Sequence, residues 1–236
     1  MIKNFFILIG GTAFAQIISI ASTPLLTRIF SPDDFGILGS ILAISAIISV
    51  LGSMKYDMAI VLAENNKEAS HIQFLSIIIL CLLTIALFLI SLIIPSYLFK
   101  IIGLQFNIFW LTPLFFFISL NSIFSSRLNR EEMYKHLSLS QIIKRFIIVI
   151  SQIIFGYVGF GPIGLIIGNI LGVASSTIYL YIYNISFLNF KNEYINYKYF
   201  TKVANKYKQF PIYTVPQTIL NTFVIQLPII FLGIFY

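Results

Sequence analysis

Seven apolar runs, each about twenty residues long or longer, divide this sequence. A helix needs about 20 mostly apolar residues to cross the hydrocarbon core of a bilayer. The runs cover residues 5–30, 35–54, 72–94, 104–124, 142–160, 162–187 and 212–236. Charged residues make up only 10% of the chain, whereas a soluble domain carries about 25%. We therefore predict an all-α integral membrane protein whose transmembrane helices are joined by short connections.

Basic residues are concentrated in alternate connections between these runs. With the amino terminus in the cytoplasm, 13 of the 15 Lys and Arg residues lie at the amino terminus or in or beside even-numbered connections, and only Arg28 and Lys100 lie in or beside odd ones. The 13 include Lys144 and Arg145, which are expected to reach the interface from the first turns of the fifth run. Cytoplasmic connections carry an excess of Lys and Arg, so we predict a cytoplasmic amino terminus. Topology alone explains the clusters, although they also suit anionic lipid head groups or a partner enzyme.

The connection after the second run, residues 54–69, is too apolar for a free loop and too charged to cross the membrane. We expect a short helix or an extended segment at the cytoplasmic face. In this segment, Asp57 is expected to be a solvated surface charge, or to pair with Lys55 or with a basic residue from another connection.

The other acidic pairs have simple expected roles. Asp33 and Asp34 precede the second apolar run, where carboxylates stabilise a helix N-terminus. Glu131 and Glu132 lie among basic residues and are expected to be solvated.

The first apolar run carries a stripe of polar side chains. The stripe consists of Thr12, Gln16, Ser19 and Thr23. Their spacing of four, three and four residues places them on one face of a helix. Pro24 interrupts the backbone hydrogen bonds and Arg28 is costly within a membrane, so this helix is predicted to line a polar path. The alternatives are helix packing through Thr and Ser, with Arg28 as an anchor at the water interface.

The last apolar run carries a similar pattern. Gln217 and Asn221 lie four residues apart and Pro228 follows them, as Pro24 follows the stripe in the first run. Both helices would start on the same side of the membrane, as a parallel two-lobe repeat requires. The polar residues of both runs are therefore candidates for lining a substrate cavity, and Pro24, Pro216 and Pro228 are candidate helix breaks or hinges.

Small residues recur in the sixth run. Gly164, Gly168 and Gly172 are spaced by four residues and form a smooth strip on a helix. Such strips allow two helices to approach closely, so these glycines are predicted to serve helix packing.

Patterns for catalysis or metal binding are missing from the sequence. Neither His71 nor His136 is followed three or four residues later by a potential ligand, and Cys81 is the single cysteine. The mixture of Lys and Tyr at 189–210 lies between membrane spans, which argues against nucleic acid. We expect a chain that is not an enzyme, with no cofactor and no metal site.

Three motifs resemble a known family. They are PLLTRIFSPDDFG at 24–36, KYDMAIVLA at 55–63, and KYKQFPIYTVPQTILN at 206–221, followed by Leu227-Pro228. Together they resemble the amino-terminal half of the polysaccharide-biosynthesis flippases of the multidrug/oligosaccharidyl-lipid/polysaccharide exporter superfamily. O-antigen flippases are the most similar subgroup, and the resemblance covers essentially the whole chain.

The resemblance implies a fold and a cargo. The fold has two six-helix lobes and a central cavity between the first and seventh helices. The cargo is an undecaprenyl-pyrophosphate-linked oligosaccharide, moved across the bacterial inner membrane for O-antigen, lipopolysaccharide or another surface polysaccharide. A polysaccharide polymerase and a chain-length regulator are the candidate partners. Arg28 is the candidate for binding the pyrophosphate, because a guanidinium group forms bidentate hydrogen bonds with phosphate.

The resemblance also implies about twice as many spans as the sequence contains. We therefore expect a first transmembrane lobe at 1–188, a cytoplasmic connection at 189–211, and the first helix of a second lobe at 212–236. On this interpretation the chain is an incomplete transporter of the two-lobe type.

Three other functions are alternatives for a membrane protein of this kind. A cation-coupled multidrug exporter usually depends on carboxylates within the membrane, whereas all eight Asp and Glu residues lie in or beside connections. A membrane-embedded polysaccharide polymerase would carry a large periplasmic loop, and the outward connections are short. A purely structural membrane subunit is the third alternative.

Overall fold

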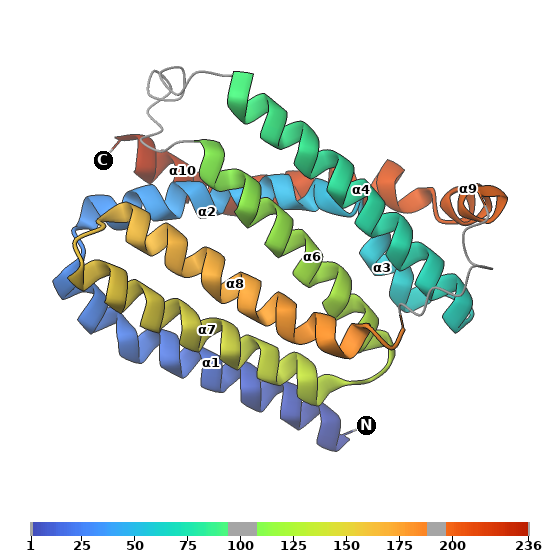
Figure 1. The fold of residues 1–236 in the computed structure, drawn as a ribbon, viewed down its shortest axis with the longest axis horizontal. Coiled ribbons are helices and arrows are strands. Elements are labelled where there is room, and N and C mark those ends of the chain that lie inside the picture. Colours follow the sequence, from blue (N-terminus) through green and yellow to red (C-terminus); the bar gives the residue numbers. More distant parts are fainter. Residues whose placement is uncertain (1, 94–107, 188–196, 236) are drawn as a thin grey trace.

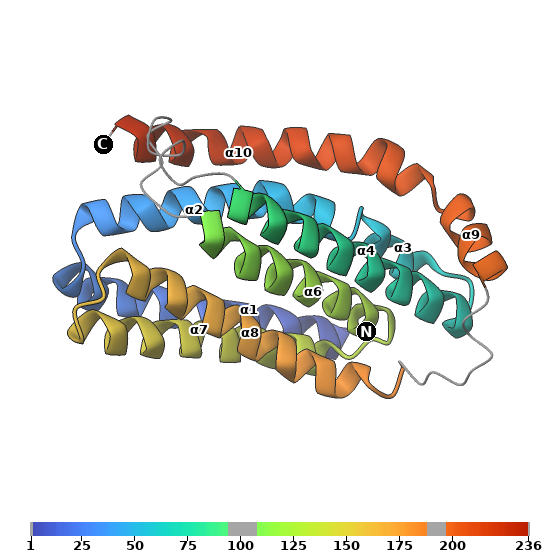
Figure 2. The same ribbon diagram turned by 45° about the horizontal axis from the view of Figure 1, so that its top comes forward.

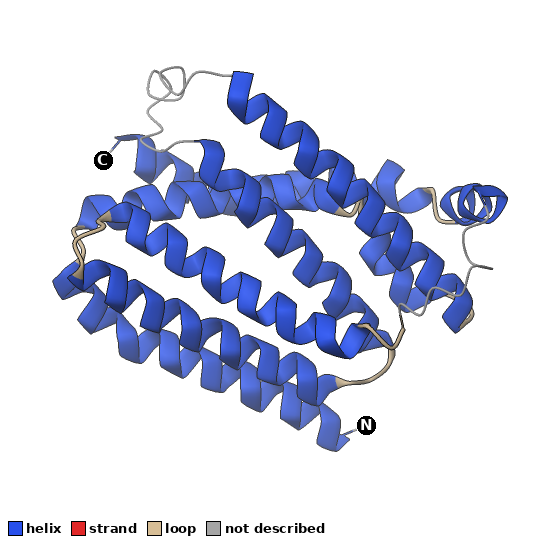
Figure 3. Ribbon diagram, viewed as in Figure 1, coloured by secondary structure: helices blue, strands red, loops and turns tan. Residues whose placement is uncertain are grey.

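The computed structural model describes residues 2–93, 108–187 and 197–235. All regular elements in these ranges are helical, as Figures 1 and 3 show, so the predicted all-α fold is confirmed. Six of the helices are long and apolar enough to cross a membrane. They are α1 (Ile2–Ile29), α2 (Pro32–Gly52), α4 (Asn66–Ile93), α6 (Leu111–Arg130), α7 (Tyr134–Tyr157) and α8 (Pro162–Asn184).

The remaining elements connect or follow these six helices. They are α3 (Tyr56–Leu62), the 3₁₀ turn η1 (Ile108–Trp110), α9 (Tyr197–Lys206), the π-helical turn η3 (Phe210–Thr214) and α10 (Val215–Phe235). The segment expected at 54–69 thus forms α3 and the first turn of α4. Helix α10 overlaps the seventh predicted run, 212–236. The start of the fourth run and part of the connection at 189–211 lie outside the described residues.

Two helices extend well beyond their apolar runs. Helix α7 begins at Tyr134, so Lys144 and Arg145 lie well inside it. Helix α6 ends at Arg130, six residues beyond the predicted apolar run. Arg127 and Arg130 therefore belong to this helix, whereas the sequence had placed them in a connection. The predicted boundaries were wrong because an apolar run marks only the part of a helix that lies in hydrocarbon.

Helix α6 lies at the centre of the bundle, where it contacts α2, α4 and α8. Helix α7 packs along α8, and α1 packs along α7. Helix α10 packs along α2, and Figures 1 and 2 show α1 and α10 at different edges of the bundle with α2 between them. Each of the two helices with a predicted polar face therefore contacts the bundle mainly through one neighbour.

A capping box fixes the start of α2. Ser31 is the N-cap residue, and its hydroxyl accepts a hydrogen bond from the backbone N–H of Asp34 at 3.3 Å. In return, the Asp34 carboxylate accepts the backbone N–H of Ser31 at 2.9 Å. This reciprocal arrangement satisfies two donors that a helix start leaves unpaired. The predicted capping role is confirmed for Asp34, and Asp33 lies in the same first turn.

Large apolar side chains cover the outside of the bundle. Ile20, Ile93 and Leu220 are 71%, 78% and 67% exposed, and they belong to α1, α4 and α10. Apolar faces of this extent mark contact with a membrane or with another protein. Together with the lengths of the helices, they make the chain a multi-pass membrane protein.

The glycine strip of α8 faces α7. A Cβ atom at Gly164 would meet Phe155, and one at Gly168 would lie 2.6 Å from Cγ of Gln152. A Cβ atom at Gly172 would meet Ile148. Because all three neighbours belong to α7, the strip lets the two helices approach more closely than side chains would allow.

We expect Gly172→Ala to destabilise the bundle. Its Cβ atom would lie 2.7 Å from the backbone carbonyl oxygen of Lys144, and a backbone cannot turn aside as a side chain can. The free energy of unfolding should fall by about 1–3 kcal/mol, measured by denaturation in detergent with the single Trp110 as the fluorescent probe. Gly36→Ala in α2 is the control, since nothing lies within 4 Å of its Cβ position. Equal losses for both variants would contradict the close α7–α8 packing.

Candidate functional site

The polar stripe of α1 lies beside the face that packs on α7. On that packed face, Gly11 leaves no room for a side chain because Ser138 of α7 occupies the space, and Ala15 and Leu26 are buried. On the stripe, Thr12, Gln16 and Thr23 are exposed and Ser19 is half-buried. Gln16 forms no hydrogen bond with any described residue. Most of the stripe is therefore uncovered by this lobe.

Hydroxyl groups surround Pro24, which lies inside the continuous helix α1. Proline has no N–H group and cannot donate the usual helical hydrogen bond. Close to Pro24, Thr23 Oγ1 and Ser22 Oγ donate to the carbonyl oxygen of Ser19 at 2.9 and 2.8 Å. Thr27 Oγ1 donates to the carbonyl oxygen of Pro24 at 3.2 Å. Thr23 thus lies on the stripe and also donates a hydrogen bond to the backbone of its own helix.

Arg28 lies exposed in the last turn of α1, close to the turn that joins α1 to α2. A helix C-terminus favours a positive charge at this position. The nearby carboxylate of Asp34 is already used by the cap at Ser31. Among the described residues, none forms an ion pair with Arg28. Its guanidinium group is therefore available to an anion.

The polar residues of α10 lie apart from those of α1. Gln217 and Asn221 are exposed, and neither has a hydrogen-bond partner among the described residues. Pro216 follows the π-helical turn at the start of α10, and Pro228 lies inside the helix. Because α2 lies between α1 and α10, the structure does not bring the two polar patterns together. Figure 2 shows α10 at the top edge of the bundle beside α2, with α1 on the other side of α2.

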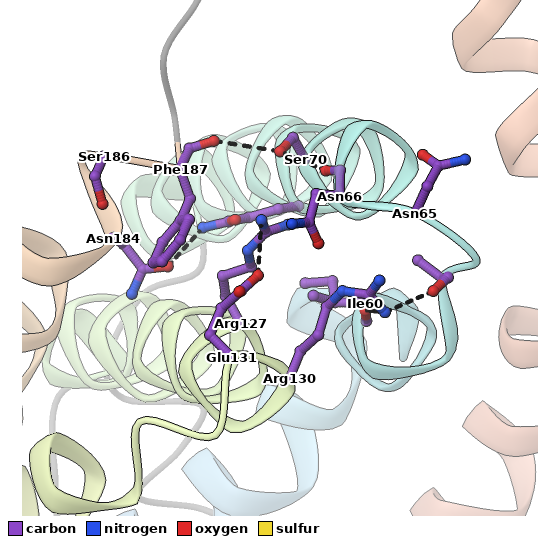
Figure 4. A network of polar contacts seen from close by, with 12 residues as sticks. Ile60, Asn65, Asn66, Ser70, Arg127, Arg130, Glu131, Asn184, Ser186 and Phe187 are labelled. Carbon is purple, nitrogen blue, oxygen red and sulfur yellow. Dashed lines mark hydrogen bonds and ion pairs between the residues drawn. The ribbon is translucent and has the colours of Figure 1, made fainter.

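The end of the bundle opposite to Arg28 holds a network of buried polar groups that was not predicted from the sequence. We call it the basic end; there α3 and the first turns of α4 meet the last turns of α6 and α8 (Figure 4). Asp57 of α3 is only 5% exposed. Its two carboxylate oxygens each accept a hydrogen bond of 2.7 Å, one from Ser53 and one from Ser122 of α6. The predicted solvated charge or pair with Lys55 is therefore wrong: Asp57 joins α3 to α6.

Arg127 is the largest fully buried side chain of the basic end, with 1% exposure. Its Nη2 atom lies 3.0 Å from Glu131, and its guanidinium group lies 4.9 Å from the ring centre of Phe187. The prediction that Glu131 is freely solvated is wrong, because burial of Arg127 requires a carboxylate partner. Nε and Nη1 of Arg127 have no hydrogen-bond partner among the described residues.

Arg130 closes the C-terminal end of α3. Its Nη1 atom donates to the backbone carbonyl oxygens of Ile60, Val61 and Ala63 at 3.4, 3.1 and 2.6 Å (Figure 4). The last carbonyl groups of a helix have no partner within the helix, and a basic side chain can satisfy them. Arg130 therefore holds the end of α3 against the end of α6.

Two buried amides complete the network. Gln73 of α4 donates through Nε2 to Oδ1 of Asn184 in α8 at 3.1 Å. Asn184 in turn donates to the carbonyl oxygen of Phe124 in α6 at 3.3 Å. These bonds link three helices, and both amides are fully buried. Among the contacts of the basic end, only short-range ones such as the four-residue spacing of Arg127 and Glu131 could have been inferred from the sequence.

We expect Asp57→Ala to loosen the contact between α3 and α6. The change leaves the hydroxyls of Ser53 and Ser122 without their acceptor, so the free energy of unfolding in detergent should fall by about 1–3 kcal/mol. Ser122→Ala should cost less once Asp57 is absent, with a coupling energy of at least about 0.5 kcal/mol in a double-mutant cycle. Additive losses would show that the two side chains do not depend on each other.

Comparison with known proteins identifies the family. A family model described as a polysaccharide biosynthesis protein matches residues 25–236. The match includes Arg28, α3 and α10, whereas the stripe at residues 12–23 precedes it. No curated protein and no solved structure matches the chain. Because the match covers most of its length, this membrane protein belongs to the polysaccharide biosynthesis protein family.

Proposed function

We propose that this chain forms one lobe of a flippase that moves an undecaprenyl-pyrophosphate-linked oligosaccharide across the bacterial inner membrane. The product would be O-antigen, lipopolysaccharide or another surface polysaccharide. The family supports a role in the synthesis or export of polysaccharide. The membrane-spanning helices suit a protein that moves its cargo across the bilayer.

The observation that carries the proposal is the uncovered polar face of α1. Within a mostly apolar span, Gln16 and Arg28 have no hydrogen-bonding or ionic partner among the described residues, although both are costly in lipid. Such groups normally face a bundle interior or a water-filled cavity. A phosphorylated sugar offers both the negative charge that suits Arg28 and the hydroxyl groups that suit amide side chains.

A second membrane unit would complete the cavity. Helix α1 leaves its stripe uncovered at one edge, and α10 leaves Gln217 and Asn221 uncovered at another. In the proposed transporter, α10 is the first helix of the second lobe, and both polar faces contribute to the cavity. Rocking of the lobes would carry the head group across while the polyprenyl tail stays in the bilayer.

The proposal includes an orientation. The basic end holds Lys67, Arg130 and Lys206, and Lys and Arg accumulate on the cytoplasmic side of membranes. The amino terminus and the basic end would then face the cytoplasm, and Arg28 would lie towards the periplasm. A polymerase and a chain-length regulator remain the candidate partners on the synthetic route.

A cation-coupled multidrug exporter is less well supported. The buried carboxylates that such a protein would use are Asp57 and Glu68, and both lie at the basic end. Two serine hydroxyls donate hydrogen bonds to the Asp57 carboxylate, and Lys206 forms an ion pair with Glu68 at 2.7 Å. These partners give both carboxylates a structural role in the lobe.

We expect Arg28→Ala to reduce surface polysaccharide about tenfold or more in the complete transporter, because a charge-assisted hydrogen bond contributes about 1.5–3 kcal/mol. Lipid-linked oligosaccharide should accumulate in the cytoplasmic leaflet, and the amount of protein in the membrane should not change. Surface polysaccharide and leaflet-specific lectin labelling measure the two effects.

Two variants serve as controls. Arg28→Lys keeps the charge and should recover part of the export, whereas Lys67→Ala removes an exposed charge at the basic end and should have no effect. Normal export by Arg28→Ala would show that Arg28 is only an interface anchor.

A further inference from the structure

The side of α6 that lies between α4 and α8 forms the floor of a groove. Both helices pack along α6, which separates them in Figures 1 and 2. They meet at the basic end, where Gln73 donates to Asn184 and the hydroxyl of Ser70 lies 3.2 Å from the carbonyl oxygen of Phe187 (Figure 4). Beyond these contacts, two cavities follow one another between α4 and α8.

The two cavities are continuous. The one nearer the basic end has a volume of about 290 Å³ and the next one of about 480 Å³. Phe116 and Phe117 of α6 line both of them. Together they extend from Phe124 to Trp110, which is about 21 Å at the rise of an α-helix. This length exceeds the roughly 15 Å of hydrocarbon that one leaflet contributes to a bilayer.

The walls of the groove offer few polar atoms to a ligand. Apart from three threonines and Cys81, the lining residues are apolar or aromatic. Thr84 and Thr177 each donate a hydrogen bond, of 2.7 and 2.8 Å, to the carbonyl oxygen four residues earlier in their own helix. Apolar cavities stay free of water, and one of roughly 150 Å³ takes up benzene. The groove is therefore suited to a hydrocarbon.

The groove is continuous with the apolar surface that faces the membrane. Cys81 lines the cavity nearer the basic end and is itself exposed, so this cavity is open. Leu82 and Ile85 of α4 and Ile182 of α8, next to the walls, are exposed as well. An α-helix with its side chains is about 10–12 Å across, which is too wide for the groove, whereas a single hydrocarbon chain is thin enough. The occupant that the surroundings supply is a lipid chain.

Tyr181 marks the end of the groove at which the polar part of a lipid would lie. Its ring lines the cavity and packs on Phe124, with the ring centres 5.8 Å apart. Its hydroxyl has no hydrogen-bond partner among the described residues, and the side chain is 44% exposed. Tyrosines at membrane interfaces keep the ring in apolar surroundings and the hydroxyl at the level of the head groups. A chain in the groove would therefore belong to a lipid of the leaflet at the basic end.

We propose that the groove between α4 and α8 binds one acyl chain of a phospholipid. The ester group lies at Tyr181, and the chain extends along α6 past the middle of the membrane towards Trp110. The chain supplies packing between α4 and α8 that no described side chain provides, since atoms that line an unfilled cavity lose dispersion contacts. The site does not depend on the proposed flippase function.

Native mass spectrometry of the 236-residue chain tests the site. The protein would be stripped of lipid in a sterol-based detergent, which carries no flexible alkyl chain, and titrated with palmitoyl-oleoyl phosphatidylglycerol. We expect one saturable adduct with the mass of the phospholipid. The melting temperature should rise with it, because a ligand that binds only the folded state stabilises that state.

A bulky side chain in the groove should displace the lipid. Cys81→Trp and Ile178→Trp fill the cavity from opposite walls, and each should weaken phospholipid binding about tenfold or more. Leu82→Trp and Ile182→Trp add the same bulk to the neighbouring exposed surface and should bind the lipid as the unaltered chain does. Because Ile178 is 59% exposed, its variant tests the site even if Cys81→Trp does not fold.

Two further measurements locate the chain within the groove. Tyr181→Phe keeps the ring and loses the hydroxyl, so it should weaken binding about two- to tenfold. Cys81 is the single cysteine, and a membrane-soluble maleimide should react with it several-fold faster in the stripped protein than in the lipid-saturated protein. Leu82→Cys in a Cys81→Ser background is the matched control and should react equally fast in both.

Three results would overturn the site. The first is the absence of a phospholipid adduct, and the second is equal binding by the groove variants and the surface variants. The third is displacement of the phospholipid by undecaprenyl phosphate at equal concentration, which would assign the groove to a polyprenyl chain. Loss of the adduct only in the groove variants, together with protection of Cys81, supports the acyl-chain site.

Discussion

Hydrocarbon offers no hydrogen-bond partner, and this constraint governs every polar group in the lobe. At the basic end, the lobe answers it by pairing buried groups with one another. Arg127 has Glu131 and the ring of Phe187, Asp57 has two serine hydroxyls, and Gln73 has Asn184. These contacts join α3, α4, α6 and α8, so the packing of the helices and the satisfaction of the polar groups depend on each other.

Several polar residues on α1 and α10, by contrast, are exposed and have no partner among the described residues. Gln16, Arg28, Gln217 and Asn221 point away from the interior of the lobe and find no partner among its described residues. A chain under selection only for stability in lipid would replace such residues with apolar ones, since each costs free energy in the membrane. The contrast between a largely paired network and these exposed polar side chains is what distinguishes a structural cluster from a candidate path in this protein.

Firm contacts also fix the segment between α8 and α10. Apolar burial of Val203, Tyr207 and Phe210 and the attachment of Lys206 hold α9 on the bundle. The π-helical turn with Pro211 then leads into α10, which packs along α2.

The sequence by itself determined the all-α fold, the approximate membrane helices, and the faces on which polar residues lie, because length and helical period are local properties of the chain. It also determined the cap at Ser31 and Asp34, whose partners are three residues apart. Only the tertiary structure decided which charges are buried. Asp57 meets Ser122 across 65 positions, Lys206 meets Glu68 across 138, and no local pattern predicts such pairs. The helix ends at Arg130 and Tyr134 could not be read from the apolar runs, because apolar character stops at the edge of the hydrocarbon and helical backbone does not.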